Sequence, residues 1–119
     1  MAPSTFEELS GRELDAAVAR HLFGFEVEER ENTKTGAKDA VCRAPGKDWV
    51  RVAYYSASMG ASLNVQLAIQ NRGWKWVDQR PRGSGEVRVV LEHADGRVVE
   101  ASGPVNEALC RAALKAVVS

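Results

Sequence analysis

The first quarter of the chain carries a clear helical pattern, which follows a short lead-in over residues 1–9. Residues spaced three, four, seven and eight apart lie on one face of a helix, and such a face is formed here by Leu14, Ala17, Val18, His21 and Leu22. Ser10 and Glu13 have the spacing of a capping box, and Leu9 precedes the cap where a hydrophobic staple begins. Gly24 is a natural C-terminal stop. We therefore predict a helix that begins near Ser10 and ends before Gly24.

The next stretch has a weaker pattern, typical of short strands and turns. Residues 25–28 and 39–43 are short runs that favour strands, and residues 49–54 favour an extended segment. Between the first two, residues 29–38 are polar and lack apolar periodicity, which predicts an exposed, mobile loop. Pro45-Gly46 predicts a turn.

A second helix is predicted from about Ala57 to Arg72. Ser56 or Ser58 can cap its N-terminus, and Gly73 can end it. Its expected apolar stripe consists of Met59, Leu63 and Leu67, widened by Val65 and Ile69.

The last third predicts three strands and a final helix. Val87, Val89 and Leu91 alternate with polar residues, as in a half-buried strand, and Asp95-Gly96 is a strong hairpin signal. With a turn over 81–85, the sequence predicts an antiparallel meander with strands over 74–78, 86–93 and 97–101. After Gly103-Pro104, a helix is expected over 105–118. Together these elements predict a single α+β domain over 1–119, an antiparallel sheet of three to five strands covered by three helices.

Composition narrows the classes of function. The 119 residues are 45% hydrophobic and 27% charged, and 16 basic residues balance 16 acidic ones. A neutral chain argues against nucleic-acid binding through bulk charge. Two cysteines are too few for a disulfide framework, and we expect Cys42 and Cys110 to pack as small hydrophobes. No apolar run is long enough for a membrane span, and no secretory leader follows Met1.

The best candidate site centres on Tyr54-Tyr55-Ser56-Ala57-Ser58-Met59-Gly60. A helix N-terminus attracts anions, the hydroxyls add hydrogen bonds, and flat rings stack on bases. An aromatic pocket with a cationic rim would suit a nucleotide-like ligand and would be built from Arg43, Trp49, Tyr54, Tyr55, Ser56, Ser58, Trp74 and Trp76. The alternative is that Ser56 only caps the helix while Tyr55 and Trp74 fill the core.

Other constellations favour no chemistry. His21 and His93 lack a second ligand at metal spacing, so we predict no metal and no cofactor. The acidic cluster Glu26, Glu28, Glu29 and Glu31 is typical of a solvated surface. No Walker loop occurs, since Gly83-Ser84-Gly85 lies in an expected hairpin turn.

Several short motifs together resemble a family of small bacteriophage proteins, the phage α-β-α sandwich domain. They are Gly11-Arg12-Glu13-Leu14-Asp15, Pro45-Gly46, Trp49-Val50, Tyr55-Ser56 with Ala57 and Ala61, and the run from Ala108 to Leu114. The chain departs from the family pattern at Ser58, where an acidic residue is usual, and at Leu63, where an aromatic is usual. The resemblance implies a sandwich fold, a phage origin and action in the cytoplasm of the infected bacterium, and it brings no assigned activity.

The sequence supports two hypotheses of function. The first is a non-enzymatic protein that sequesters a nucleotide-derived small molecule, such as a host immune signal, and so counters host defence. The second is an adaptor or inhibitor that binds a host or phage protein through the acid-rich N-terminal third. An enzyme that degrades such a ligand is a third reading with no catalytic set behind it. A homo-oligomer is plausible in each case, because pairing adds burial to a small domain.

Overall fold

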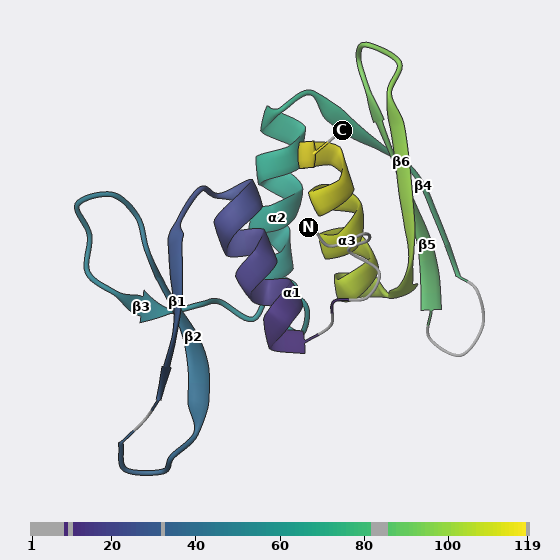
Figure 1. Cartoon of the computed structure of the whole chain (residues 1–119). Coiled ribbons are helices and arrows are strands. Elements are labelled where there is room, and N and C mark those ends of the chain that lie inside the picture. The colour runs from purple at the N-terminus through teal and green to yellow at the C-terminus, as the bar shows by residue number, and fades with distance from the viewer. Residues whose placement is uncertain (1–8, 10, 32, 82–85, 119) are drawn as a thin grey trace.

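The fold is given by a computed structural model that describes residues 9, 11–31, 33–81 and 86–118. Within these residues the chain forms three helices and two three-stranded antiparallel sheets. The predicted α+β class is confirmed, and the arrangement is compatible with a sandwich of sheets and helices. Figure 1 shows the order of the layers, in which the helices lie between the two sheets.

The first sheet is made of β1 (Glu26–Glu31), β2 (Lys38–Arg43) and the two-residue β3 (Val50–Arg51), in that order. The loop predicted over 29–38 is too long, because residues 29–31 pair with residues 38–40. Opposite charges face each other across this ladder, at Arg30↔Asp39 and Glu31↔Lys38. Such cross-strand pairs stabilise a strand that lacks apolar alternation. The polar sequence therefore gives no local signal of this pairing.

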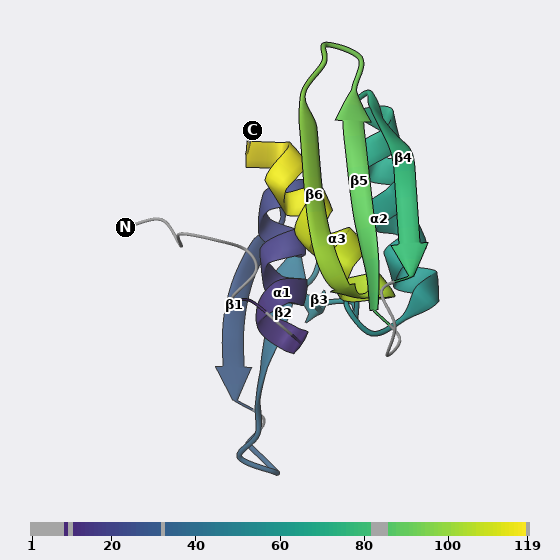
Figure 2. The ribbon, with the colours of Figure 1, turned by 90° about the vertical axis from the view of Figure 1, so that its right-hand side faces the viewer.

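The second sheet is the predicted meander of β4 (Trp74–Pro81), β5 (Glu86–His93) and β6 (Val98–Pro104). The turn expected over 81–85 lies mostly outside the described residues, and Pro81 itself ends β4. Figure 2 shows this sheet with α2 (Met59–Asn71) behind β4 and α3 (Val105–Val118) behind β6. The sheet therefore covers one side of the helical layer.

The first helix changes its type along its length. It begins as α1 (Gly11–Ala17) and continues as a π-helical turn, η2 (Val18–Leu22). A π turn bonds five residues back and so holds an extra residue, which rotates the following side chains. Ala19 is consequently buried and His21 is exposed, so the prediction that His21 shares the apolar face is wrong. Ser10 of the predicted capping box lies outside the described residues.

Helix α2 begins two residues later than predicted and buries a different face. The hydroxyl of Ser58 caps it by accepting a hydrogen bond from the Ala61 N–H at 3.3 Å. Its buried face consists of Ser62, Val65 and Ile69. The prediction is therefore right for Val65 and Ile69 and wrong for the main stripe of Met59, Leu63 and Leu67. The Ser62 hydroxyl lies 3.0 Å from the Asn106 side-chain oxygen on α3, because a small polar residue lets the two helices approach closely. Met59, Leu63 and Leu67 are 70%, 50% and 57% exposed instead.

Helix α3 forms the centre of the core. It buries Ala108, Leu109, Cys110, Ala112, Ala113, Leu114 and Ala116. Cys42 and Cys110 are both free and buried, as predicted. In the ranges that the structure describes, no helix combines the length and the apolar character that crossing a bilayer would require.

Candidate functional site

The motif at the start of α1 works as a joint between the first helix and the first sheet. The Arg12 guanidinium donates to Asp15 Oδ2 and to Asp39 Oδ1, each at 2.9 Å, and to the Val52 carbonyl at 2.8 Å. Asp15 is only 1% exposed. A buried carboxylate needs such partners to offset its lost hydration, so these two residues are structural.

The Tyr55-Ser56 pair is held by the same joint. The backbone N–H of Ser56 donates to Asp15 Oδ1 at 2.7 Å, and the Ser56 hydroxyl donates to the Gly11 carbonyl at 3.2 Å. Since Ser58 caps α2, both serine hydroxyls are occupied within the protein. The predicted anion site at this helix start therefore has no free hydroxyl. Sequence reasoning missed Asp15, although a carboxylate beside the apolar stripe was a visible signal.

The eight residues of the predicted aromatic pocket are divided among three places. Arg43 lies in β2 and Trp49 directly precedes β3 of the first sheet, Tyr54 to Ser58 lie in the turn before α2, and Trp74 and Trp76 lie in β4 of the second sheet. The two sheets lie on opposite sides of the helical layer (Figure 1). These residues consequently do not line one common pocket.

At Trp49 an aromatic ring and cations do meet. The guanidinium carbons of Arg30 and Arg43 lie 4.5 and 4.7 Å from the centre of its ring. Each arginine also forms an ion pair, Arg30 with Glu28 and Arg43 with Glu26, both at 3.0 Å. Both of the cations that contact the Trp49 ring are therefore already paired with carboxylates. The same pairs neutralise half of the acidic cluster noted in the sequence.

Three other aromatic residues of the predicted pocket are each placed by the surrounding protein. Tyr54 is 43% exposed and lies under the Arg12 guanidinium, 4.1 Å from its ring centre. Trp74 is buried and meets the ring of His93 edge-on at 5.2 Å. The Trp76 indole N–H is buried without a hydrogen-bond partner among the described residues.

Tyr55 belongs to a different concavity, which we call the aromatic hollow. It has a volume of about 340 Å³ and lies where the end of η2, the start of β1 and one side of α2 meet. It is lined by Phe23, Phe25, Tyr55, Asn64, Leu67, Ala68 and Asn71. Arg72 connects two of these elements, because its guanidinium at the end of α2 donates a hydrogen bond to the carbonyl of Leu22 at the end of η2, at 2.9 Å.

Three stacked rings form one wall of the aromatic hollow. The centre of the Phe23 ring lies 5.6 Å from that of Phe25 and 5.4 Å from that of Tyr55, with interplanar angles of 15° and 24°. Burial, followed by the nearby Cys42 thiol and Asp15 carboxylate, raises the pKa of Tyr55 to about 12. The tyrosine therefore stays neutral and contributes its ring.

Two further residues that line the hollow add polar groups without charge. Neither the Asn64 nor the Asn71 amide has a hydrogen-bond partner within the described part of the chain. Small-molecule sites combine apolar walls with a few placed polar groups, and an amide can both donate and accept. Phe23 and Phe25 went unnoticed in the sequence, because they lie at a helix end and a strand start, about thirty residues from Tyr55.

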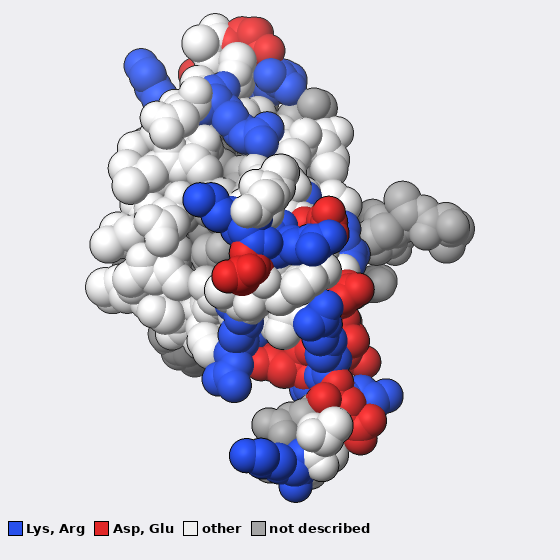
Figure 3. Space-filling view, turned by 90° about the vertical axis from the view of Figure 1, so that its left-hand side faces the viewer, with Lys and Arg blue, Asp and Glu red and all other residues white. Residues whose placement is uncertain are grey.

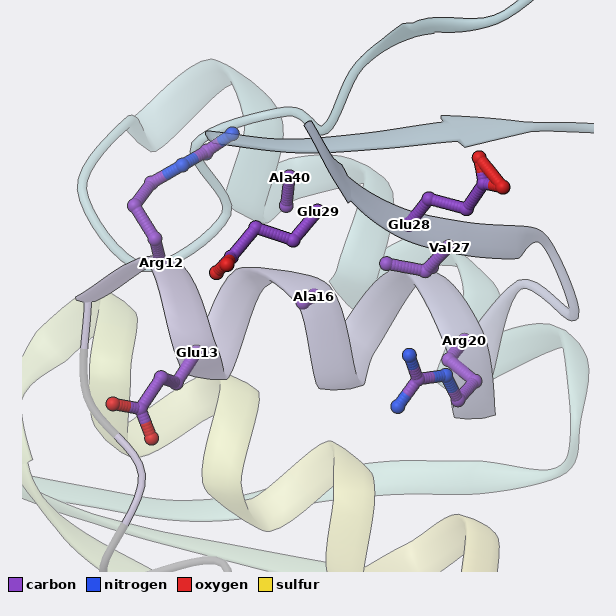
Figure 4. A pocket seen from close by; sticks show the side chains of 8 residues that line it. All are labelled: Arg12, Glu13, Ala16, Arg20, Val27, Glu28, Glu29 and Ala40. Carbon is purple, nitrogen blue, oxygen red and sulfur yellow. The ribbon is translucent and has the colours of Figure 1, made fainter. Parts of the chain in front are cut away.

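A second concavity, the charged groove, lies between the first helix and the first sheet. Its volume is about 240 Å³, and Glu13 and Arg20 lie toward its two ends, with Ala16 between them (Figure 4). Glu29 points from β1 toward the helix. Among the described residues, none of these three charged side chains has an ion-pair partner. Without a ring to stack on, and with three carboxylates that repel phosphate, the groove suits a nucleotide less than the aromatic hollow does.

No metal chemistry is indicated in the part of the chain that the structure describes, where no three His, Cys, Asp or Glu side chains gather as ligands would. No model of a known protein family matches the chain, and a search of curated proteins finds no match.

Proposed function

We propose that the protein is a non-enzymatic binding domain that holds a planar, nucleotide-derived ligand by its base in the aromatic hollow. The observation that carries this proposal is a hollow lined both by three stacked rings and by two amides with no partner among the described residues.

Each part of the hollow has a role in this proposal. Stacking of one base on an aromatic side chain contributes about 1–3 kcal/mol. The amides of Asn64 and Asn71 would donate to and accept from the edge of the base. The lining residues include no charge, so the base is recognised and the phosphates extend into solvent.

The setting of this binding comes from the resemblance to the phage α-β-α sandwich domain. We propose a phage protein that works in the cytoplasm of the infected bacterium and withdraws a nucleotide signal from host defence. Sequestration needs only affinity and abundance, which agrees with a site that has ring and amide contacts and no acid, base or metal set.

The first test is native mass spectrometry of the protein purified from phage-infected cells. We expect a retained mass in the nucleotide range, and we expect that mass to disappear in Asn64→Ala and Phe25→Leu. Asn64 is exposed and Phe25→Leu keeps an apolar side chain, so both variants should fold. Val98→Ala, on the exposed side of β6, is the matched control and should retain the ligand.

The second measurement titrates adenosine into the wild-type protein and follows the side-chain amide signals of Asn64 and Asn71 by NMR. Loss of the Phe25 ring should weaken binding about tenfold or more, since it removes stacking energy of the size given above. Amide signals that do not move up to millimolar adenosine, together with a ligand-free mass, would overturn the proposal.

A further inference from the structure

We propose that a second copy of this chain covers the exposed side of α2, so that each copy closes the aromatic hollow of the other. The ligand part of this inference rests on the proposed function, whereas the pairing itself does not. The pairing is argued from three features of α2, namely its apolar stripe, its lack of charge and the position of the hollow along it.

The first feature is a straight apolar stripe. Met59, Leu63 and Leu67 lie four residues apart on one side of α2, and each is at least half exposed. Single exposed apolar residues are ordinary, but a contiguous apolar patch marks an interaction surface. Gly60 leaves open space beside this stripe, since a Cβ there would meet only the Ser58 hydroxyl at 3.8 Å.

The second feature, the absence of charge, favours a second copy of the chain as the partner of α2. From Ala53 to Asn71 the chain has no Asp, Glu, Lys or Arg, although 27% of the whole chain is charged. In Figure 3 charged side chains gather over the first sheet and its hairpin and again at the top of the view, while the left part of that face is white. In a two-fold pair a surface meets itself, so any charge near the axis would face its own kind. A surface without charge satisfies that condition, and it offers nothing to a partner chosen by opposite charge.

The third feature is self-complementarity along the helix. Two α2 helices that cross antiparallel at Leu63 place Met59 of each opposite Leu67 of the other, about 6 Å from the axis on either side. Leu67 lines the aromatic hollow. The flexible side chain of Met59, which suits irregular surfaces, would therefore reach the mouth of the partner's hollow.

This pairing explains why the hollow is open in a single copy. Closure by the partner would exclude water from the base and slow release of the ligand, which adds to the affinity of the hollow. Because α2 is about 20 Å long, the contact is at the small end of stable interfaces. We therefore expect a dimer that dissociates upon dilution into the low micromolar range.

The test is sedimentation equilibrium of the wild type, Leu63→Glu and the control Val98→Glu over about 1–300 µM, a range that spans weak interfaces. Leu63 and Val98 are similarly exposed, at 50% and 56%, so both variants should fold, which circular dichroism checks. We expect the wild type and Val98→Glu to dimerise and Leu63→Glu to remain monomeric. A wild type that stays monomeric throughout, or a Leu63→Glu variant that dimerises equally well, would overturn the inference.

Adenosine separates this inference from the proposed function. With pairing and ligand binding both present, Leu63→Glu should bind adenosine at least tenfold more weakly than Val98→Glu. A dimer that binds no adenosine would refute the proposed function and leave the pairing intact. Equal binding by the monomeric Leu63→Glu and the dimeric control would refute closure of the hollow by the partner. A host protein held by α2 in place of the second copy would appear as a monomeric wild type and overturn the pairing.

Discussion

At the scale of single residues, the interior concentrates titratable groups around Asp15. The Tyr55 hydroxyl lies near enough to the Cys42 and Cys110 thiols and to the Asp15 carboxylate for their charges to act on it, and the Asp15 charge also acts on Cys110. Burial, followed by the Asp15 and Glu107 carboxylates, raises the pKa of Cys110 to about 12. These groups are therefore held in their neutral forms, and a second negative charge beside Asp15 would be poorly tolerated.

This environment predicts that the protein loses stability in alkali. The unfolded chain releases its thiol protons near pH 8.5 and its tyrosine protons near pH 10, whereas the folded chain keeps those of Cys110 and Tyr55 to about pH 12. Between these limits the folded state binds more protons, so the free energy of unfolding falls as pH rises. Urea unfolding from about pH 7 to pH 10 should show this decline, with a shallower slope for Cys110→Ala. Native Cys110 that reacts with a thiol reagent as fast as free cysteine would contradict the assignment.

At the scale of elements, the π turn in η2 decides which residues of the first helix face the core. An uninterrupted α-helix would turn His21 inward, while the π turn buries Ala19 and leaves His21 in solvent. The extra residue also sets the direction in which the chain leaves the helix. Phe23 and Phe25 consequently stack where the aromatic hollow forms.

The π turn gives a paired prediction. Ala19 is fully buried, so Ala19→Leu should overpack the core and lower the free energy of unfolding by about 1–3 kcal/mol. His21→Leu places the same side chain two residues later on the exposed side and should change stability by no more than about 0.5 kcal/mol. Urea denaturation of the two variants compares them directly, and the reverse order of costs would mean that the helix is a regular α-helix.

The elements also show how far the sequence could lead. The meander over β4 to β6 was predictable, because the partial alternation in β5 and the Asp-Gly turn are local signals, and α3 was predictable from its start after Gly103-Pro104. On α2 two stripes satisfy helical spacing, Met59–Leu63–Leu67 and Ser62–Val65–Ile69, and hydrophobicity favours the first. The contact between Ser62 and Asn106, which lies in another helix, decides for the second. The hollow was beyond prediction for the same reason, since Phe25 and Asn71 come together only through tertiary packing.

At the scale of the whole molecule, the two sheets are attached to the helices in different ways. The second sheet packs on α3 through buried Val89, Leu91 and Ala101. The first sheet is more polar and exposed, and the Arg12 guanidinium connects it to α1 through Asp39 and the Val52 carbonyl. Elements with few buried apolar contacts open locally before the rest unfolds. The first sheet should therefore be the less stable part.

Replacement of Arg12 tests this difference. Arg12→Ala should speed amide hydrogen exchange across β2 and residues 50–53 while β5 and β6 remain protected. Arg12→Lys should recover only part of the protection, because an ammonium group cannot reproduce the fork of the guanidinium. Arg20→Ala, which removes an exposed arginine from the same helix, is the control. Uniform loss of protection in both sheets would mean that the molecule opens as one unit.

The joint formed by Arg12 and Asp15 has a consequence for how such proteins diversify. Two of the motifs by which this chain resembles a phage family, Gly11 to Asp15 and Tyr55-Ser56, join elements to one another, and of their side chains only the Tyr55 ring lines the aromatic hollow. Other chains with the same joints would keep the architecture whatever they bind. Under the proposed function, changes at Phe25, Asn64 or Asn71 would alter which ligand the domain holds while the scaffold stayed intact. We propose that a phage would in this way follow a host that changes its signalling chemistry.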